Sequence, residues 1–123
     1  SFAFQPHTVN ISTNTNNLQI GVFGLVKINC TANSDLTGLV SENVQSNTVI
    51  TPGSSTTPAL DGQLVYLLNT GTNTLTLKHE DANSTAVNRL YTHNGNNLTM
   101  PSGHITMCLY DTAISRWRVW SLV

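Results

Sequence analysis

The stretch DGQLVYLLNTGTNTLTLKHEDANSTAVNRL, residues 61–90, decides the fold class. Its apolar runs are short, alternate with polar residues and end at Asn, Thr and Gly, which is the pattern of strands and turns. A cluster of three ionisable residues, His79, Glu80 and Asp81, stands in its middle. This cluster is a reaction site, a ligand-binding site or a corner of a sheet. The rest of the sequence helps to decide among these three roles.

The apolar period of two continues along the chain. No stretch carries apolar residues at i, i+3, i+4 and i+7 for long enough to form a helix, so an all-β protein is expected. The eight predicted strands are Leu18–Ile20, Leu25–Cys30, Asn47–Thr51, Gln63–Asn69, Thr74–His79, Leu98–Met100, His104–Asp111 and Trp117–Leu122.

Alternation assigns side chains to the two faces of each strand. In LVKINC the expected inward set is Val26, Ile28 and Cys30. In HITMCLYD one face carries Ile105, Met107 and Leu109, and the other carries Thr106, Cys108 and Tyr110.

Turn residues separate the strands at residues 69–73, 94–97, 101–103 and 111–115. Gly71, Gly95 and Gly103 can adopt positive φ in these turns. Many short strands with such turns are typical of an antiparallel β-sandwich of jelly-roll type. The 123 residues suffice for one domain, 1–123, in which residues 1–10 are a candidate N-terminal arm.

Polarity in this chain comes from hydroxyls and amides rather than from charge. Ser, Thr and Asn supply 44 of the 123 residues, whereas charged residues make up 9% and the net charge is −1. No basic stripe is present to bind phosphates or anionic lipid, so neither nucleic acid nor a membrane is an expected partner. No stretch has the roughly 18 apolar residues of a membrane span and the start lacks signal-peptide features, so a soluble chain is expected.

The cluster at residues 79–81 does not have the spacing of a catalytic site. Glu80 and Asp81 are adjacent, so on a strand they point to opposite faces, whereas an acid–base pair must flank one bond. The chain has no G-x-S-x-G, H-E-x-x-H or Gly-rich phosphate loop. Metal binding by His79 with Glu80 or His93 has no supporting spacing. We therefore expect no enzyme activity, no metal and no cofactor.

Two cysteines, Cys30 and Cys108, each stand on an alternating strand-like stretch. They either pair in a disulfide or remain as buried free thiols, and free thiols are the favoured interpretation, typical of a chain made in a reducing cytosol.

The few charged residues are expected to be paired, because burying a lone charge costs several kcal/mol. Arg89 is predicted to pair with Glu80 or Asp111 and so to fix residues 81–88 across the end of the sheet. The alternative is an exposed pair that contributes under about 1 kcal/mol.

Four stretches together resemble a module of tailed-bacteriophage structural proteins: LTGL (36–39), residues 61–90, LTMPSGHITMCLYD (98–111) and SRWRVW (115–120). The resemblance covers about residues 36–120. Nine matching residues are candidates for a structural motif: His79, Glu80, Asp81, Asn88, Arg89, Tyr110, Asp111, Arg116 and Trp117. The other matches are Gly62, Asn69, Gly71, Ser84 and Gly103.

The resemblance implies a virion surface protein, made in the host cytoplasm, that is β-rich and forms homotrimers. A capsid decoration (cement) protein that contacts the major capsid protein is the leading hypothesis. A tail-fibre module that recognises a host glycan or protein is the alternative, with stacking by Tyr66, Tyr91, Trp117 and Trp120. A depolymerase is the least favoured hypothesis.

Three apolar residues are candidates for an interface or arm: Phe2, Phe4 and Trp120. The N-terminal arm either docks on a neighbouring subunit or folds back onto its own domain.

Overall fold

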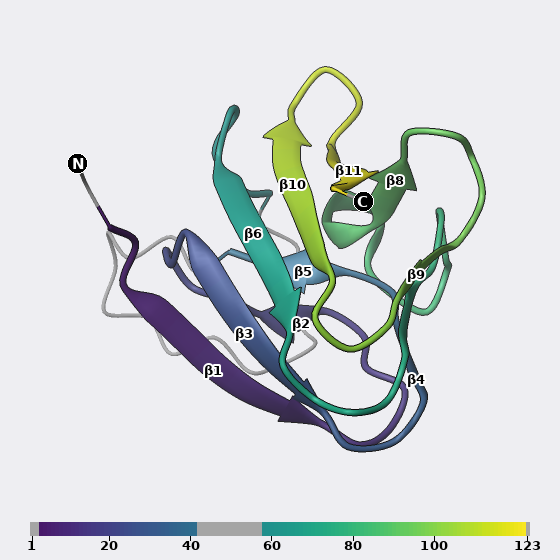
Figure 1. Ribbon diagram of the computed structural model, residues 1–123. Coiled ribbons are helices and arrows are strands. Elements are labelled where there is room, and N and C mark those ends of the chain that lie inside the picture. The colour runs from purple at the N-terminus through teal and green to yellow at the C-terminus, as the bar shows by residue number, and fades with distance from the viewer. Residues whose placement is uncertain (1–2, 42–57, 123) are drawn as a thin grey trace.

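A computed structural model describes residues 3–41 and 58–122. The protein is all-β in these ranges, as expected from the apolar period. Apart from one 3-10 turn, η1 (Ala86–Asn88), its elements are strands (Figure 1). The strands are β1 (Pro6–Ile11), β2 (Leu18–Gln19), β3 (Leu25–Cys30), β4 (Ser34–Leu36), β5 (Leu39–Val40), β6 (Leu64–Asn69), β7 (Leu75–Leu77), β8 (Leu90–Thr92), β9 (Leu98–Met100), β10 (Ile105–Asp111) and β11 (Arg116–Ser121).

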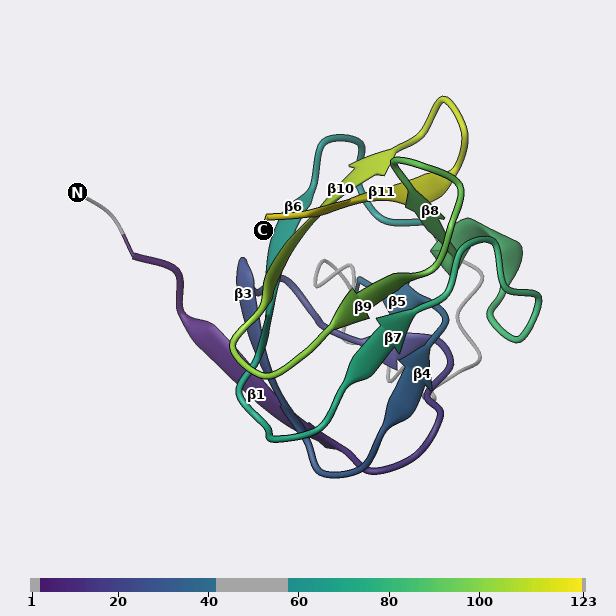
Figure 2. The same ribbon diagram turned by 45° about the vertical axis from the view of Figure 1, so that its right-hand side comes forward.

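The first three long strands are successive turns of a coil. β1, β3 and β6 lie side by side and parallel in a six-stranded sheet of order β1-β3-β6-β10-β11-β8. After each of these strands the chain crosses to smaller sheets, where β2 pairs with β5 and β4 pairs with β7, again in parallel. Figure 2 shows β4, β7 and β9 side by side across the molecule from β3 and β6. The smaller sheets thus serve as the crossover connections that parallel strands require.

The last third of the chain closes the coil with antiparallel pairs. β9 pairs with β7, β10 pairs with β6, and β11 pairs with β10, all antiparallel. The short strand β8 then pairs with β11 in parallel at the far edge of the six-stranded sheet.

The prediction of an antiparallel sandwich was therefore wrong about strand direction. The observed strand directions are not those of an antiparallel jelly roll. The six-stranded and three-stranded sheets are mixed, and in the described residues five of the eight strand pairings are parallel. The apolar period of two is the same for both directions, so the sequence pattern could not separate them.

Most predicted strands are confirmed, and two of them, Leu25–Cys30 and Leu98–Met100, match to the residue. Four observed strands were not predicted: β1, β4, β5 and β8. Three of these have only two or three residues, and β1 begins with Pro6, which is tolerated on an edge strand. The predicted strand Asn47–Thr51 lies outside the described residues.

The core lies between the six-stranded sheet and the smaller sheets. Val26, Ile28 and Cys30 are buried as predicted. On β10 the buried face is the one with Cys108 and Tyr110, so the more aliphatic face of that strand points outward. Both cysteines are buried free thiols, and burial raises the pKa of each.

Asparagine side chains join successive turns of the coil at its corner. Oδ1 of Asn14 accepts the backbone N–H of Asp35 at 2.9 Å, and Oδ1 of Asn33 accepts that of Thr74 at 2.9 Å. Each amide oxygen thus pairs with a backbone N–H of the next turn of the coil. Some of the many Asn residues of this chain therefore stabilise the fold by joining neighbouring turns of the coil.

The turn glycines serve two different purposes. Gly95 and Gly103 adopt φ of 75° and 83°, as predicted. Gly71 does not have positive φ, and its role is close approach: an added Cβ would lie 2.3 Å from the backbone N and O of Cys30. Only glycine allows the third turn of the coil to pack this tightly on the second.

Candidate functional site

The cluster at residues 79–81 follows β7 and ties it to the far edge of the six-stranded sheet. Glu80 adopts φ of 49°, and its backbone N–H donates to the carbonyl of Leu90 at 2.9 Å. Nε and Nη2 of Arg116, on β11, donate to the two carboxylate oxygens of Glu80. The left-handed residue therefore turns the chain so that its carboxylate reaches β11.

The neighbours of Glu80 are also held by internal hydrogen bonds. Nδ1 of His79 accepts the backbone N–H of Thr92 at 3.1 Å, so a neutral imidazole carries its proton on Nε2. Oδ1 of Asp81 accepts the backbone N–H of Asn83 at 2.8 Å, which is an Asx-turn. The three side chains point to three different partners and do not converge on one point.

A buried polar network lies beneath this corner. Oγ of Ser84 lies 2.6 Å from Oγ1 of Thr37 and accepts the backbone N–H of Asn17 at 2.9 Å. The amide of Asn88 donates to Oδ1 of Asn17 at 3.0 Å. The network joins the first two turns of the coil to the loop after residue 81. An added Cβ at Gly38 would lie 2.4 Å from Oγ of Ser84, so this position also requires glycine.

The predicted partner of Arg89 was wrong. Nε of Arg89 donates to the backbone carbonyl of Ser84 at 3.0 Å. The two carboxylates are paired by other arginines: Glu80 by Arg116, and Asp111 by Arg118. Two strand pairings account for this outcome. The backbone of Glu80 binds Leu90, which lies opposite Trp117, the neighbour of Arg116, in the pairing of β8 with β11. The pairing of β10 with β11 brings Asp111 within reach of Arg118. Arg89 still fixes the loop before it, through a backbone group.

The pair of Asp111 and Arg118 lies at the outer side of β10 and β11. Nε of Arg118 donates to Oδ2 of Asp111 at 2.8 Å, and the backbone N–H of Ala113 donates to Oδ1 at 2.9 Å. The hydrogen bond from Arg118 and then that from Ala113 lower the pKa of Asp111 below its ordinary value. The guanidinium of Arg118 also lies 5.8 Å from the ring centroid of Tyr91, within cation–π range.

Because the pKa of Asp111 is lowered in the folded state, its ionised form stabilises the fold above the unfolded pKa of about 4. We expect Asp111→Asn to be less stable than the parent at neutral pH. The difference should shrink as the pH falls from about 4 through the lowered pKa, where the parent carboxylate becomes protonated. Urea unfolding of both proteins across this range measures the difference, and a difference that is independent of pH would contradict the assignment.

The two aromatic residues of the motif are core residues. Trp117 is fully buried, and its Nε1 donates to the carbonyl of Leu39 at 3.0 Å. Tyr110 packs edge-on against it with ring centroids 5.2 Å apart, and its hydroxyl donates to the carbonyl of Val87 at 2.8 Å. Trp117 is therefore not placed to stack on a glycan, which corrects that part of the alternative hypothesis.

The other candidate aromatic residues lie at the surface. Tyr91 is 40% exposed, and its ring stands 4.8 Å from that of His79 in an edge-on contact. Phe4 folds back onto its own domain, 5.9 Å from Tyr66. Trp120 is half-buried on β11, and Phe2 lies outside the described residues.

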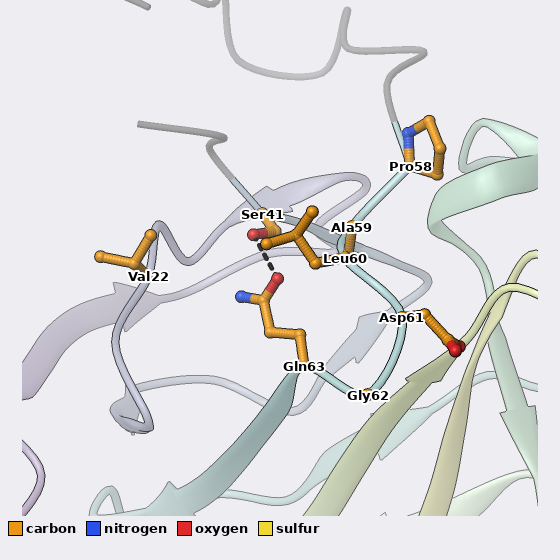
Figure 3. Close-up of a pocket in the computed structure, with 8 residues that line it drawn as sticks. All are labelled: Val22, Ser41, Pro58, Ala59, Leu60, Asp61, Gly62 and Gln63. Atoms are coloured by element: carbon orange, nitrogen blue, oxygen red, sulfur yellow. Dashed lines mark hydrogen bonds between the residues drawn. The ribbon is translucent and has the colours of Figure 1, made fainter. Parts of the chain in front are cut away.

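A hollow of about 340 Å³ lies beside the start of β6 (Figure 3). Its lining includes Val22, Leu60 and Asp61, and Oγ of Ser41 donates to Oε1 of Gln63 at 2.7 Å in its wall. The hollow lies between the described chain ends at residues 41 and 58. No residue of the motif lines it.

Residues 3–41 and 58–122 contain no group of three or more His, Cys, Asp or Glu placed to hold a metal ion. No helix in the same ranges is long and apolar enough to cross a membrane. No protein-family model, curated protein or solved structure matches the chain.

Sequence reasoning identified the motif residues and included Thr37 and Gly38 in the stretch LTGL (36–39), but it gave these two residues no role and missed Asn17. These residues are more than forty positions from Ser84, their shared partner. No local pattern signals such a contact, and only the coil brings the segments together.

Proposed function

We propose that the chain is a structural protein of the virion surface of a tailed bacteriophage, a capsid decoration protein that stabilises the shell. It would act by contact with other copies of itself, as a homotrimer, and with the major capsid protein. The resemblance over residues 36–120 supplies the virion context. The all-β fold, with its closely packed coil, suits a small rigid module on a particle surface.

The observation that carries the proposal is that each of the nine motif side chains makes an internal hydrogen bond. The carboxylates bind arginines or backbone N–H groups, and His79, Asn88, Tyr110 and Trp117 each bind another part of the domain. The motif side chains therefore stabilise the domain, and the protein would act through residues at its surface. A protein that stabilises a shell needs such a stable domain, because it acts through area buried between subunits.

The thiols support synthesis in the host cytoplasm. Cys30 and Cys108 are both buried and unpaired with each other, as is usual for chains that fold under reducing conditions.

Immunogold labelling or cryo-electron microscopy of purified virions tests the proposal. We expect the chain over the capsomers, and heads assembled without it should lose their DNA at a lower temperature than decorated heads. Adding the purified chain back should restore heat resistance. A chain found only at the tail tip would contradict decoration and favour the alternative, and a chain absent from virions would contradict both.

The alternative is a tail-fibre module that binds a host surface glycan or protein. The exposed ring of Tyr91 favours it, because His79 and Arg118 flank that ring and could hydrogen-bond a ligand stacked on it. Under this alternative, Tyr91→Ala should abolish binding to host cells while leaving the fold intact. Equal binding by the variant and the parent would contradict it.

A further inference from the structure

The outward face of the six-stranded sheet carries a continuous apolar patch on its four central strands, β3, β6, β10 and β11. Registers place Leu25, Tyr66, Met107 and Trp120 side by side across β3, β6, β10 and β11. Leu64 and Leu109 form a second row, and Leu68 and Ile105 a third, which Leu122 extends through its backbone hydrogen bond to Ile105. We call the surface made by these side chains the outer face: Leu25, Leu64, Tyr66, Leu68, Ile105, Met107, Leu109, Trp120 and Leu122.

This composition is unusual for a sheet face that meets water. A sheet with one solvated face normally alternates apolar and polar residues. β6 instead has five apolar residues in succession, Leu64–Leu68, and on β10 the outward face is the more aliphatic one. Ile105 is 40% exposed and Leu122 is 52% exposed. Strands that are apolar on both sides are typical of sheets covered on both sides.

We propose that the outer face is the surface through which copies of this chain contact one another. Its centre has no charged side chain and includes Tyr66, Met107 and Trp120, residue types enriched at the centre of protein interfaces. Both signs of charge border it directly: Lys27 lies opposite Leu68, Arg118 lies opposite Leu109, and Asp111 follows Leu109 on the same face of β10 and pairs with Arg118. A second copy therefore meets an apolar centre whose border carries both positive and negative charges, so repulsion between like charges does not oppose the contact.

The size of the face fits the apolar centre of an interface. Its four strands, β3, β6, β10 and β11, are spaced about 4.8 Å apart and are about 20 Å long, so they present about 400 Å² in projection. Side chains that project from the sheet raise the accessible area above this figure. Each partner of a standard interface buries about 800 Å², so the outer face supplies about half of that area as its centre and the polar border must supply the rest. Phe4 adds to the apolar surface, since its ring packs on Tyr66 at the edge of the face.

Sedimentation velocity of the parent and two variants tests the inference. The parent should sediment as a multiple of the 13.3 kDa subunit at micromolar concentration. The double substitution Ile105→Lys and Met107→Lys should raise the dissociation constant by about 30-fold or more, because it places charges in the centre of the interface. The matched control is Leu60→Lys, which adds a charge at a 64% exposed loop residue outside the face and should keep the parent mass.

A second measurement needs no substitution. Trp120 lies on the outer face whereas Trp117 is fully buried in the core, so acrylamide quenching reports on Trp120. Dilution of the parent should increase quenching as Trp120 becomes solvated. A parent that is monomeric at micromolar concentration, or a folded double variant that keeps the parent mass, would overturn the inference. So would quenching that does not change with dilution across the dissociation of an oligomer.

The inference goes beyond the virion role and can fail separately from it. A chain that associates through the outer face but is absent from virions would support the inference and contradict the proposed function. A monomeric chain found on capsids would contradict the inference and the proposed trimer, and would support only the capsid location.

Discussion

Trp117→Ala should lower the free energy of unfolding by about 3–5 kcal/mol, the range observed when a large buried aromatic side chain is removed. Trp117 is fully buried, packs against Tyr110 and donates a hydrogen bond to the carbonyl of Leu39. Its removal leaves a cavity between β11 and β5 and an unpaired carbonyl inside it. Urea unfolding followed by circular dichroism measures the loss.

The control for this experiment is Tyr91→Ala, which removes an aromatic ring that is 40% exposed on β8. We expect a smaller loss, of about 1–2 kcal/mol, because the ring is partly exposed and no polar group is left unpaired in the core. Equal losses for the two variants would contradict the assignment of Trp117 to the core and of Tyr91 to the surface.

Asn69→Ala should lower the free energy of unfolding by about 3 kcal/mol or more, because it leaves several buried polar groups without a partner. Asn69 is fully buried, and its amide donates to the carbonyls of Asn73 at 2.7 Å and Met100 at 2.8 Å. Its Oδ1 accepts the backbone N–H of Gly71 at 3.0 Å. These bonds hold the turn after β6 against β9, so chemical denaturation of the variant measures how strongly the corner depends on one amide.

Asn29→Ala is the matched control for Asn69→Ala. The amide of Asn29 donates to Oδ1 of Asn10 at 3.1 Å on the solvated side of β3. Water can replace that partner, so we expect a loss of under about 1 kcal/mol. A loss at Asn69 as small as at Asn29 would mean that the buried amide does not anchor the turn.

Much of the fold was predictable from residue periodicity. The runs at Leu25–Cys30 and Leu98–Met100 alternate clearly and end at turn residues, so both strands were predicted with their observed bounds. Strand direction was not predictable, because a parallel strand has the same alternation as an antiparallel one. The parallel pairs here are made by a coil whose crossovers are themselves short strands, and β4 and β5 are too short to leave a periodic signal.

The residues of the candidate site were predictable from the sequence, but the contacts among them were not. The charged residues of the motif were identified, but the partner of Glu80 depends on the pairing of β8 with β11, which places Arg116 beside the turn that holds Glu80. The buried network around Ser84 depends on segments that the coil brings together from distant parts of the chain. Gly71 was expected to adopt positive φ and instead allows close packing on Cys30, a role that only the neighbouring turn explains.

The outer face has a signal in the sequence, but that signal can be interpreted only once the order of the strands in the sheet is known. The run of five apolar residues at the start of β6, Leu64–Leu68, lies near the beginning of the stretch 61–90. Periodicity assigns one half of such a run to the core but does not say what covers the other half. The structure shows that the neighbouring strand β10 extends the same apolar surface, which turns a single run into a continuous face.

The central claim is that the charged motif residues clamp the domain together, and a double-mutant cycle on Glu80 and Arg116 tests it most directly. Their side chains are 33% and 18% exposed and share two hydrogen bonds between the turn after β7 and β11. Unfolding of Glu80→Gln, Arg116→Gln and the double variant should give a coupling energy of about 1–2 kcal/mol at neutral pH. A coupling energy indistinguishable from zero would contradict the claim.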